Sequence, residues 1–143
     1  MKFQILLICM AIITTASSAQ EKIAFKVSFA EPQTHYADVE MVISGLKGDQ
    51  IDLKMPVWAP GSYLIREFAK NVEGFKAVNS DGADLMASKI NKNTWRVNTA
   101  KTSSIKVSYR VYAFELSVRT SFVDESHAFL SPTGIFLYPD GKL

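Results

Sequence analysis

Few side chains in this sequence have the types and the spacing that metal chemistry requires. Its two histidines, His35 and His127, lie far apart in the sequence. No His-x-x-x-His pair is present, which is the spacing that brings two zinc ligands to one face of a helix. The two imidazoles and Asp124 could in principle supply three ligands, but no ligand spacing points to such a site. We therefore interpret both histidines as surface or partly buried groups.

Nucleophilic and acid–base catalysis find little more support. Ser62 follows Gly61, but the surrounding sequence is not the Gly-x-Ser-x-Gly elbow of a serine hydrolase. A triad of Ser62, His127 and Asp124 can be drawn, as can many others, and we favour a Ser62 that hydrogen-bonds within its own turn. Asp124 and Glu125 are adjacent, so on a strand they would point to opposite faces and could not flank one bond. From residue chemistry alone, no catalytic machinery is visible.

Aromatic residues are the remaining groups with binding potential. Trp58 precedes an Ala-Pro-Gly segment, and Tyr63 and Arg66 follow that segment closely. An exposed aromatic platform of this kind could bind a sugar or a peptide, whereas aromatic residues within strands more often pack in the core or against a neighbouring strand. A binding platform and a structural cluster both remain open at this point.

The composition bounds the class of protein. The chain has 143 residues, of which 48% are hydrophobic, and this content excludes a disordered tail. Lysine and arginine number 16 against 14 aspartate and glutamate, which gives a formal net charge of +2. Proteins that bind nucleic acids usually carry a stronger and clustered basic excess. We expect one domain and no nucleic-acid partner.

The first 19 residues are typical of a cleaved signal peptide. Lys2 is followed by an apolar run over residues 3–13, and Ser17-Ser18-Ala19 offers small residues for cleavage before Gln20. The run is shorter than the ~20 residues that span a bilayer. We therefore expect export to the periplasm of a bacterium or secretion, no stable membrane anchor, and a domain over residues 20–143. Cleavage would remove Cys9, the one cysteine, so the mature chain would contain no disulfide.

The remainder of the chain alternates apolar and polar residues with a period of two. This pattern predicts strands with one buried and one exposed face, most clearly over residues 23–29, 39–43, 51–57 and 105–113, and a further strand over 135–138. Turn residues separate the strands at 45–49, 79–82 and 139–141. Residues 62–70 could form a short helix or a bent strand. The fold class we expect is all-β, as a single β-sandwich-like domain or a strongly curved antiparallel sheet.

Three sequence blocks resemble a known family in their order and spacing. The block over residues 55–72 resembles the P-x-W-x-P-G-S-Y-x-x-R-x-F/Y-A signature in the N-terminal domain of the glycyl-aminopeptidase family, metallopeptidase family sixty-one. Residues 92–95 look like its K-x-T-W strand, and residues 108–113 with 117–120 look like its Y-x-V-Y-A and S-V-R-T pair. The resemblance covers about residues 22–141.

This resemblance implies a larger enzyme. Full-length members look like a β-domain packed on a thermolysin-like catalytic domain, where His-Glu-x-x-His and a downstream glutamate bind one zinc ion; many members add a PDZ domain. The present sequence contains no His-Glu-x-x-His. No zinc ligand or general base is therefore carried over to it, and zinc is expected only in a catalytic domain outside this chain. The final Pro-Asp-Gly turn has no returning strand, which favours a natural protein that continues beyond Leu143.

The resemblance carries over seven positions as interdomain or substrate-cleft candidates, namely Trp58, Pro60, Gly61, Ser62, Tyr63, Arg66 and Arg119. We favour packing against the protein's own catalytic domain over direct contact with a peptide substrate, since most residues at a domain interface only pack. The function expected is that of a non-catalytic N-terminal domain of an exported zinc metallo-aminopeptidase-like protein. The alternative is a stand-alone exported peptide- or carbohydrate-binding β-module that uses Trp58, Tyr63 and Arg66.

Overall fold

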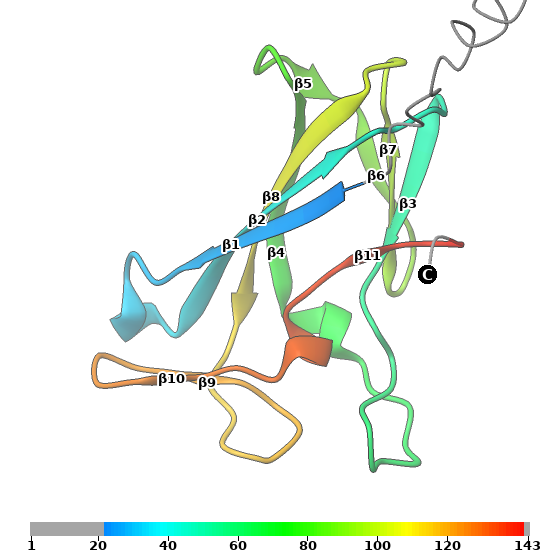
Figure 1. The fold of residues 1–143 in the computed structure, drawn as a ribbon. Coiled ribbons are helices and arrows are strands. Elements are labelled where there is room, and N and C mark those ends of the chain that lie inside the picture. Colours follow the sequence, from blue (N-terminus) through cyan, green and yellow to red (C-terminus); the bar gives the residue numbers. More distant parts are fainter. Residues whose placement is uncertain (1–21, 142–143) are drawn as a thin grey trace, which may run out of the picture.

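Alternating apolar residues build two antiparallel sheets in the computed structural model, which describes residues 22–141 (Figure 1). The larger sheet has the strand order β1 (Lys22–Ser28), β2 (Tyr36–Ser44), β8 (Ser104–Tyr112), β4 (Val72–Asn79) and β5 (Asp84–Leu85). The smaller sheet has the order β11 (Tyr138–Pro139), β3 (Gln50–Lys54), β7 (Thr94–Asn98) and β6 (Ala87–Asn91). The prediction of an all-β fold is confirmed.

Short elements connect the sheets. A separate hairpin is formed by β9 (Phe122–Val123) and β10 (Ala128–Phe129). Three 3-10 turns are η1 (Pro32–Thr34), η2 (Phe68–Asn71) and η3 (Pro132–Gly134). None of the helical turns within residues 22–141 is long and apolar enough to cross a membrane. The predicted signal peptide, residues 1–19, lies outside the described residues.

One core lies between the two sheets. Every second residue of β2 and β8 is buried, and these side chains form a single cluster with buried residues of β3 and β7. The central pair β2–β8 runs in unbroken register from Tyr36 opposite Tyr112 to Ser44 opposite Ser104. The chain therefore forms the sandwich-like arrangement that the period of two predicted.

Two predicted strands end differently from the expectation. The strand predicted over 51–57 leaves the sheet after Lys54, where Pro56 has no N–H to donate to a ladder. Of the strand predicted over 135–138, only Tyr138 pairs, opposite Lys54 of β3. Pro132 starts the 3-10 turn η3 instead, and Ile135 after it has a helical backbone conformation.

Residues 62–70 are neither a helix throughout nor a bent strand. The backbone is irregular up to Glu67, and the single turn η2 follows at Phe68–Asn71. Such an irregular segment has no ladder to satisfy its polar groups, so it depends on specific hydrogen bonds to the rest of the domain.

The inward face of β1 is only partly covered. Ile23 and Phe25 lie opposite the fully buried Ile43 and Met41 of β2, but Phe25 itself is 40% exposed. Its ring contacts Phe136 at 4.7 Å between centroids. A groove of about 480 Å³ with an almost wholly apolar lining lies beside these residues and the β11 segment. Apart from the partly buried Val27, every residue of β1 is exposed, so the alternating burial predicted for this strand is not observed.

A buried hydroxyl connects the two sheets. Tyr109 of β8 donates its hydroxyl hydrogen to the carbonyl of Ile135 at 2.9 Å and accepts the N–H of Leu137 at 3.2 Å. Residues 135–137 lead into β11 of the other sheet. Burial raises the pKa of the Tyr109 hydroxyl to about 12. The hydroxyl therefore satisfies two backbone groups that would otherwise be unpaired in the core.

Removing the Tyr109 hydroxyl tests whether its two hydrogen bonds stabilise the fold. We expect Tyr109→Phe to lower the free energy of unfolding by ~1–3 kcal/mol, because two buried backbone groups lose their partner. The folded pKa of Tyr109 lies above the unfolded value of 10, so its contribution to stability is complete below pH 10 and is lost as the pH rises from 10 towards 12. Urea unfolding at pH 7 and at pH 10–11.5 measures both effects. An equal alkaline loss of stability in the wild-type and Tyr109→Phe chains would contradict this assignment.

Candidate functional site

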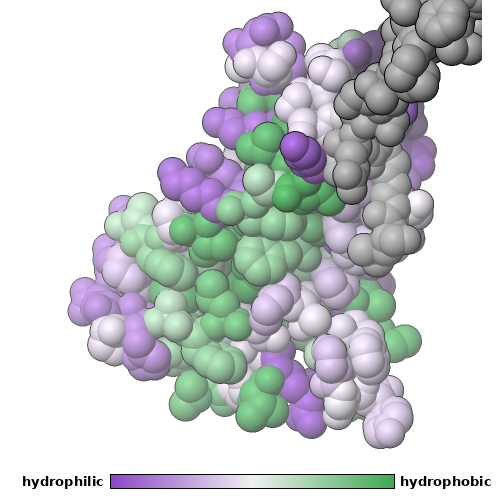
Figure 2. Space-filling view, viewed as in Figure 1, coloured by the Kyte–Doolittle hydropathy of each residue, from purple (hydrophilic) through white to green (hydrophobic). Residues whose placement is uncertain are grey.

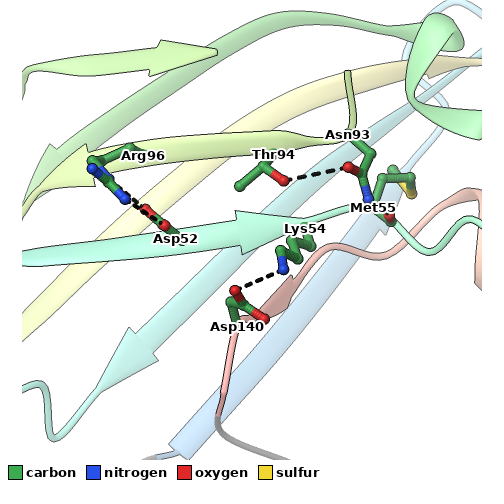
Figure 3. A network of polar contacts seen from close by, with 7 residues as sticks. All are labelled: Asp52, Lys54, Met55, Asn93, Thr94, Arg96 and Asp140. Carbon is green, nitrogen blue, oxygen red and sulfur yellow. Dashed lines mark hydrogen bonds and ion pairs between the residues drawn. The ribbon is translucent and has the colours of Figure 1, made fainter. Parts of the chain in front are cut away.

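The loop between β3 and β4 contains most of the candidate site, and its first residue is held by the β6–β7 turn. The backbone N–H of Met55 donates to the carbonyl of Asn93, and the side-chain amide of Asn93 donates to the carbonyl of Met55, both at 2.9 Å (Figure 3). Thr94 donates its hydroxyl hydrogen to the amide oxygen of Asn93 at 3.3 Å. The chain therefore leaves the sheet at a fixed point and in a fixed direction.

Ion pairs hold the strands beneath this point together. Arg96 of β7 contacts Asp52 of β3 through two nitrogens at 2.7 and 2.8 Å, and Lys54 contacts Asp140 beyond β11 at 2.7 Å (Figure 3). The hydrogen bond from Arg96 holds the pKa of Asp52 below its ordinary value. A two-nitrogen arginine–carboxylate contact is the most directional of surface ion pairs. These contacts link three adjacent strands on the outer face of the smaller sheet.

The chain makes a tight bend at Pro60-Gly61. The N–H of Ser62 donates to the carbonyl of Ala59 at 3.1 Å, and Gly61 has φ of +75°. Proline at the second position and a residue with positive φ at the third are the pattern of a type II turn. Glycine is needed there because other residues adopt such a φ only with strain.

Ser62 is buried by its own loop. The N–H of Arg66 donates to the carbonyl of Val57 at 2.7 Å and so closes the base of the loop. The Nη2 of Arg66 donates to the Oγ of Ser62 at 3.3 Å. The partner of the Ser62 hydroxyl is thus a guanidinium group of the same loop, as the simpler interpretation predicted.

His127 belongs to a different environment. Its Nδ1 lies 2.7 Å from the hydroxyl of Ser126 and 3.3 Å from Asp124 in the β9–β10 turn. Hydrogen bonds from Ser126 and from the backbone N–H of His127 lower the pKa of Asp124 to about 2. The triad of Ser62, His127 and Asp124 is therefore not formed. Within residues 22–141, no three His, Cys, Asp or Glu side chains are grouped so that they could hold a metal ion.

The tip of the loop exposes large apolar side chains. Trp58 is 54% exposed, Ile65 is 82% exposed, and Tyr63 and Leu64 also project into solvent. By contrast Trp95, within β7, is buried and stacks on Phe75 at 5.5 Å, as expected of an aromatic residue in a strand. The two tryptophans therefore differ in role, and only Trp58 is available to a partner.

A second loop lies at the same end of the sandwich (Figure 1). It follows β8 over residues 113–121 and contains the partly buried Arg119, which comes after the exposed apolar residues Leu116 and Val118. A cavity of about 250 Å³ lies between η2 and this loop, lined by Phe68 and Thr120 among others. Figure 2, from the same viewpoint, shows apolar, pale and hydrophilic residues side by side at this end. The structure thus places Arg119 at the same end as the six candidates of the first loop.

Aromatic stacking holds the second loop. The ring of His35 stacks on Phe114 with 3.7 Å between centroids, and Phe114 stacks on Phe122 at 5.2 Å. The Nδ1 of His35 donates to the carbonyl of Val123 at 2.7 Å, and the N–H of Ala113 donates to the carbonyl of His35 at 2.8 Å. His35 therefore packs and hydrogen-bonds at the start of the loop.

The end of the first loop is buried against η3. Phe68 is buried, and a Cβ built on Gly134 would lie 3.3 Å from its ring. A side chain at position 134 would make a tight contact with this ring, so the Phe68 ring or η3 would have to shift by a few tenths of an ångström. Both ends of the first loop are thus fixed to the domain, while its tip is free.

A cavity lined by basic residues lies at the base of the first loop, and the sequence did not reveal it. It has a volume of about 430 Å³ and is bordered by Arg66 and Lys70 of the loop and by Lys89 and Lys92 of the β6–β7 hairpin. These positions are up to 26 residues apart in the sequence and meet through strand pairing. The family-like blocks contain Arg66, Lys70 and Lys92, but no local pattern indicated that these residues and Lys89 would border one cavity.

Comparisons with known proteins agree with this architecture. The family model of the Peptidase M61 N-terminal domain matches residues 24–143. This chain belongs to that family. A solved aminopeptidase N family protein from Idiomarina loihiensis is similar in structure, with a TM-score of 0.78 and 34% sequence identity. The similarity covers 84% of this chain and 20% of that one, so the present chain spans about a fifth of the length of the solved relative. No curated protein matches the chain.

The positive φ of Gly61 predicts how a substitution there changes the stability of this M61 N-terminal domain. We expect Gly61→Ala to destabilise the fold by ~1–2 kcal/mol through backbone strain alone, because a Cβ there would meet no atom within 4 Å. Gly48→Ala is the matched control, since Gly48 has no positive φ and its Cβ would make ordinary contacts from 3.5 Å. Urea unfolding of both variants measures the difference. Equal stability of the two would show that the turn does not need a positive φ.

Proposed function

We propose that this domain is the non-catalytic N-terminal part of an exported zinc metallo-aminopeptidase-like protein, and that its loop end packs on the catalytic domain and borders the substrate cleft. The observation that carries the proposal is the gathering of exposed apolar side chains on two loops at one end of the sandwich, namely Trp58, Tyr63, Leu64, Ile65, Leu116 and Val118. Exposed apolar groups gathered in this way mark interaction surfaces.

The way the loops are built supports packing rather than free motion. Each loop is fixed at its base by hydrogen bonds, at Met55 and Arg66 in the first and at Ala113 in the second. A preformed surface loses little conformational entropy on association, so more of the energy of apolar burial is available for binding. The fixed bases and apolar tips fit a permanent partner within the same protein.

The remaining parts of the proposal follow from the family. The zinc ion and the general base would belong to the catalytic domain, and a peptide substrate would be met through that domain. Export would be directed by residues 1–19, to the periplasm or the medium. Neither a nucleic-acid partner nor a membrane anchor is part of this proposal.

A second candidate function is a stand-alone exported β-module that binds a peptide or a carbohydrate. The observation in its favour is that Trp58 and Tyr63 are exposed on the same loop, which also contains Arg66. Aromatic faces of this kind can stack on sugar rings or apolar peptide side chains. In that case the ligand alone should stabilise the 143-residue chain, and Trp58→Ala should abolish the effect.

The isolated chain should have no peptidase activity. We expect the purified 143-residue protein, supplied with zinc, to release no amino acid from glycyl- or alanyl-peptide substrates above a no-protein blank. Chelator-sensitive hydrolysis that co-purifies with the chain would refute a non-catalytic role.

The apolar tip can be tested in the natural full-length protein. We expect the triple variant Tyr63→Ser, Leu64→Ser, Ile65→Ser to lower its aminopeptidase activity and the unfolding temperature of the whole protein, because apolar area at the domain contact is lost. The 143-residue chain with the same substitutions should unfold at its wild-type temperature, since surface substitutions usually change stability by about 0.5 kcal/mol or less.

Met86→Ser is the matched control for this experiment. Met86 is 79% exposed but lies between β5 and β6, and its carbonyl accepts the N–H of Asn98 at the far end of β7 from the loop. The control should leave the activity and stability of the full-length protein unchanged. A triple variant that behaves like Met86→Ser would contradict packing through this loop.

A further inference from the structure

The cavity at the base of the first loop has a cationic lining that the domain itself leaves uncompensated. Of its charged groups, Lys92 pairs with Glu67 at 3.2 Å, on the exposed side. Arg66, Lys70 and Lys89 have no ion-pair partner within residues 22–141. The lining therefore holds four cationic side chains and one carboxylate, that of Glu67, which leaves three positive charges without an ion-pair partner among the described residues.

Arg66 is the least satisfied of these groups. Its Nε is covered from solvent and has no hydrogen-bond partner among the described residues. Its Nη2 has only the long contact of 3.3 Å to Ser62. A buried charged donor without an acceptor is costly and rare in native proteins, so the guanidinium group of Arg66 has unused donor capacity in the isolated domain.

The neighbouring groups hold the cavity open in a fixed form. The backbone of Arg66 is bonded to Val57 at 2.7 Å, and Lys89 lies 4.6 Å above the ring of Trp95 while its Nζ reaches the carbonyl of Ala69 at 3.5 Å. Apolar side chains, Val57 and the exposed Ile65, form part of the border. The site therefore combines a cationic interior with an apolar edge.

We propose that this cavity binds a carboxylate, namely an aspartate or glutamate side chain of the polypeptide that packs on the loop end, with Arg66 as its main donor. The guanidinium offers paired N–H groups that match the two oxygens of a carboxylate. Lys70 and Lys89 add positive charge, and Ile65 contacts the apolar neighbours of the acidic residue. This inference rests on the proposed function, in which the loop end contacts a following domain, and it names the chemistry of that contact.

A peptide titration of the 143-residue chain tests the site directly. The probes are acetyl-Leu-Glu-Leu-amide and its neutral match acetyl-Leu-Gln-Leu-amide, at constant ionic strength, followed by the ¹⁵N side-chain NMR signals of arginine. We expect a saturable shift of the Arg66 Nε signal with the glutamate peptide and binding of the glutamine peptide that is weaker by about tenfold or more. Arg66→Gln should remove the preference for glutamate.

Two further variants distinguish loss of the site from a general loss of positive charge or a failure to fold. Lys26→Gln removes the same charge from β1, outside the cavity, and should keep the preference. If Arg66→Gln fails to fold, Lys89→Gln serves in its place and should weaken binding of the glutamate peptide while leaving that of the glutamine peptide unchanged.

Three results would overturn the proposal: equal binding of the two peptides, a preference that survives Arg66→Gln, or sulfate binding as tightly as the glutamate peptide, which would indicate a general anion site. None of these three results depends on the triple variant of Tyr63, Leu64 and Ile65. The proposal of a carboxylate site and the proposal of apolar packing can therefore be refuted independently of each other.

Discussion

The hydroxyl of Tyr109 is the contact on which the arrangement of the loop end depends. It holds residues 135–137 between the two sheets, and so determines where η3 lies. Gly134 of η3 then receives the ring of Phe68, which ends the β3–β4 loop. A polar group inside the core therefore sets, through two packing steps, the position of a surface loop. An apolar residue at 109 could fill the same space but could not fix the backbone of residues 135–137.

Different residues fix the first loop in place and form its exposed surface. Polar side chains such as Asn93, Asp52 and Arg96 fix the strands and the base of the loop, and each of them has its partner within the domain. The residues at the tip, such as Tyr63 and Ile65, contribute exposed apolar area and little else to the isolated domain. Arg66 stands between the two groups, since its backbone closes the loop whereas its side chain lacks an acceptor.

The long strands and the turn at Pro60-Gly61 could be predicted from the sequence because both depend on local patterns. A period of two located β2 and β8, and proline followed by glycine located the bend. The pattern failed where tertiary contacts decide: residues 135–138 are apolar enough for a strand, but the hydroxyl of Tyr109 takes up backbone groups that a ladder would use. The motif marked Arg66. Lys89 borders the same cavity because it lies on a hairpin that is distant in the sequence but close in the fold.

The pairing of β2 with β8 has a consequence for the time course of folding. The pair joins residues 36–44 to residues 104–112, so the larger sheet can close only after about three quarters of the chain is available. Domains dominated by such distant pairings fold in about milliseconds to seconds, far more slowly than helical bundles. During synthesis the β3–β4 loop emerges long before η3, which holds its end in place. The packing of the first loop's end against η3 is therefore among the last features of the domain to form.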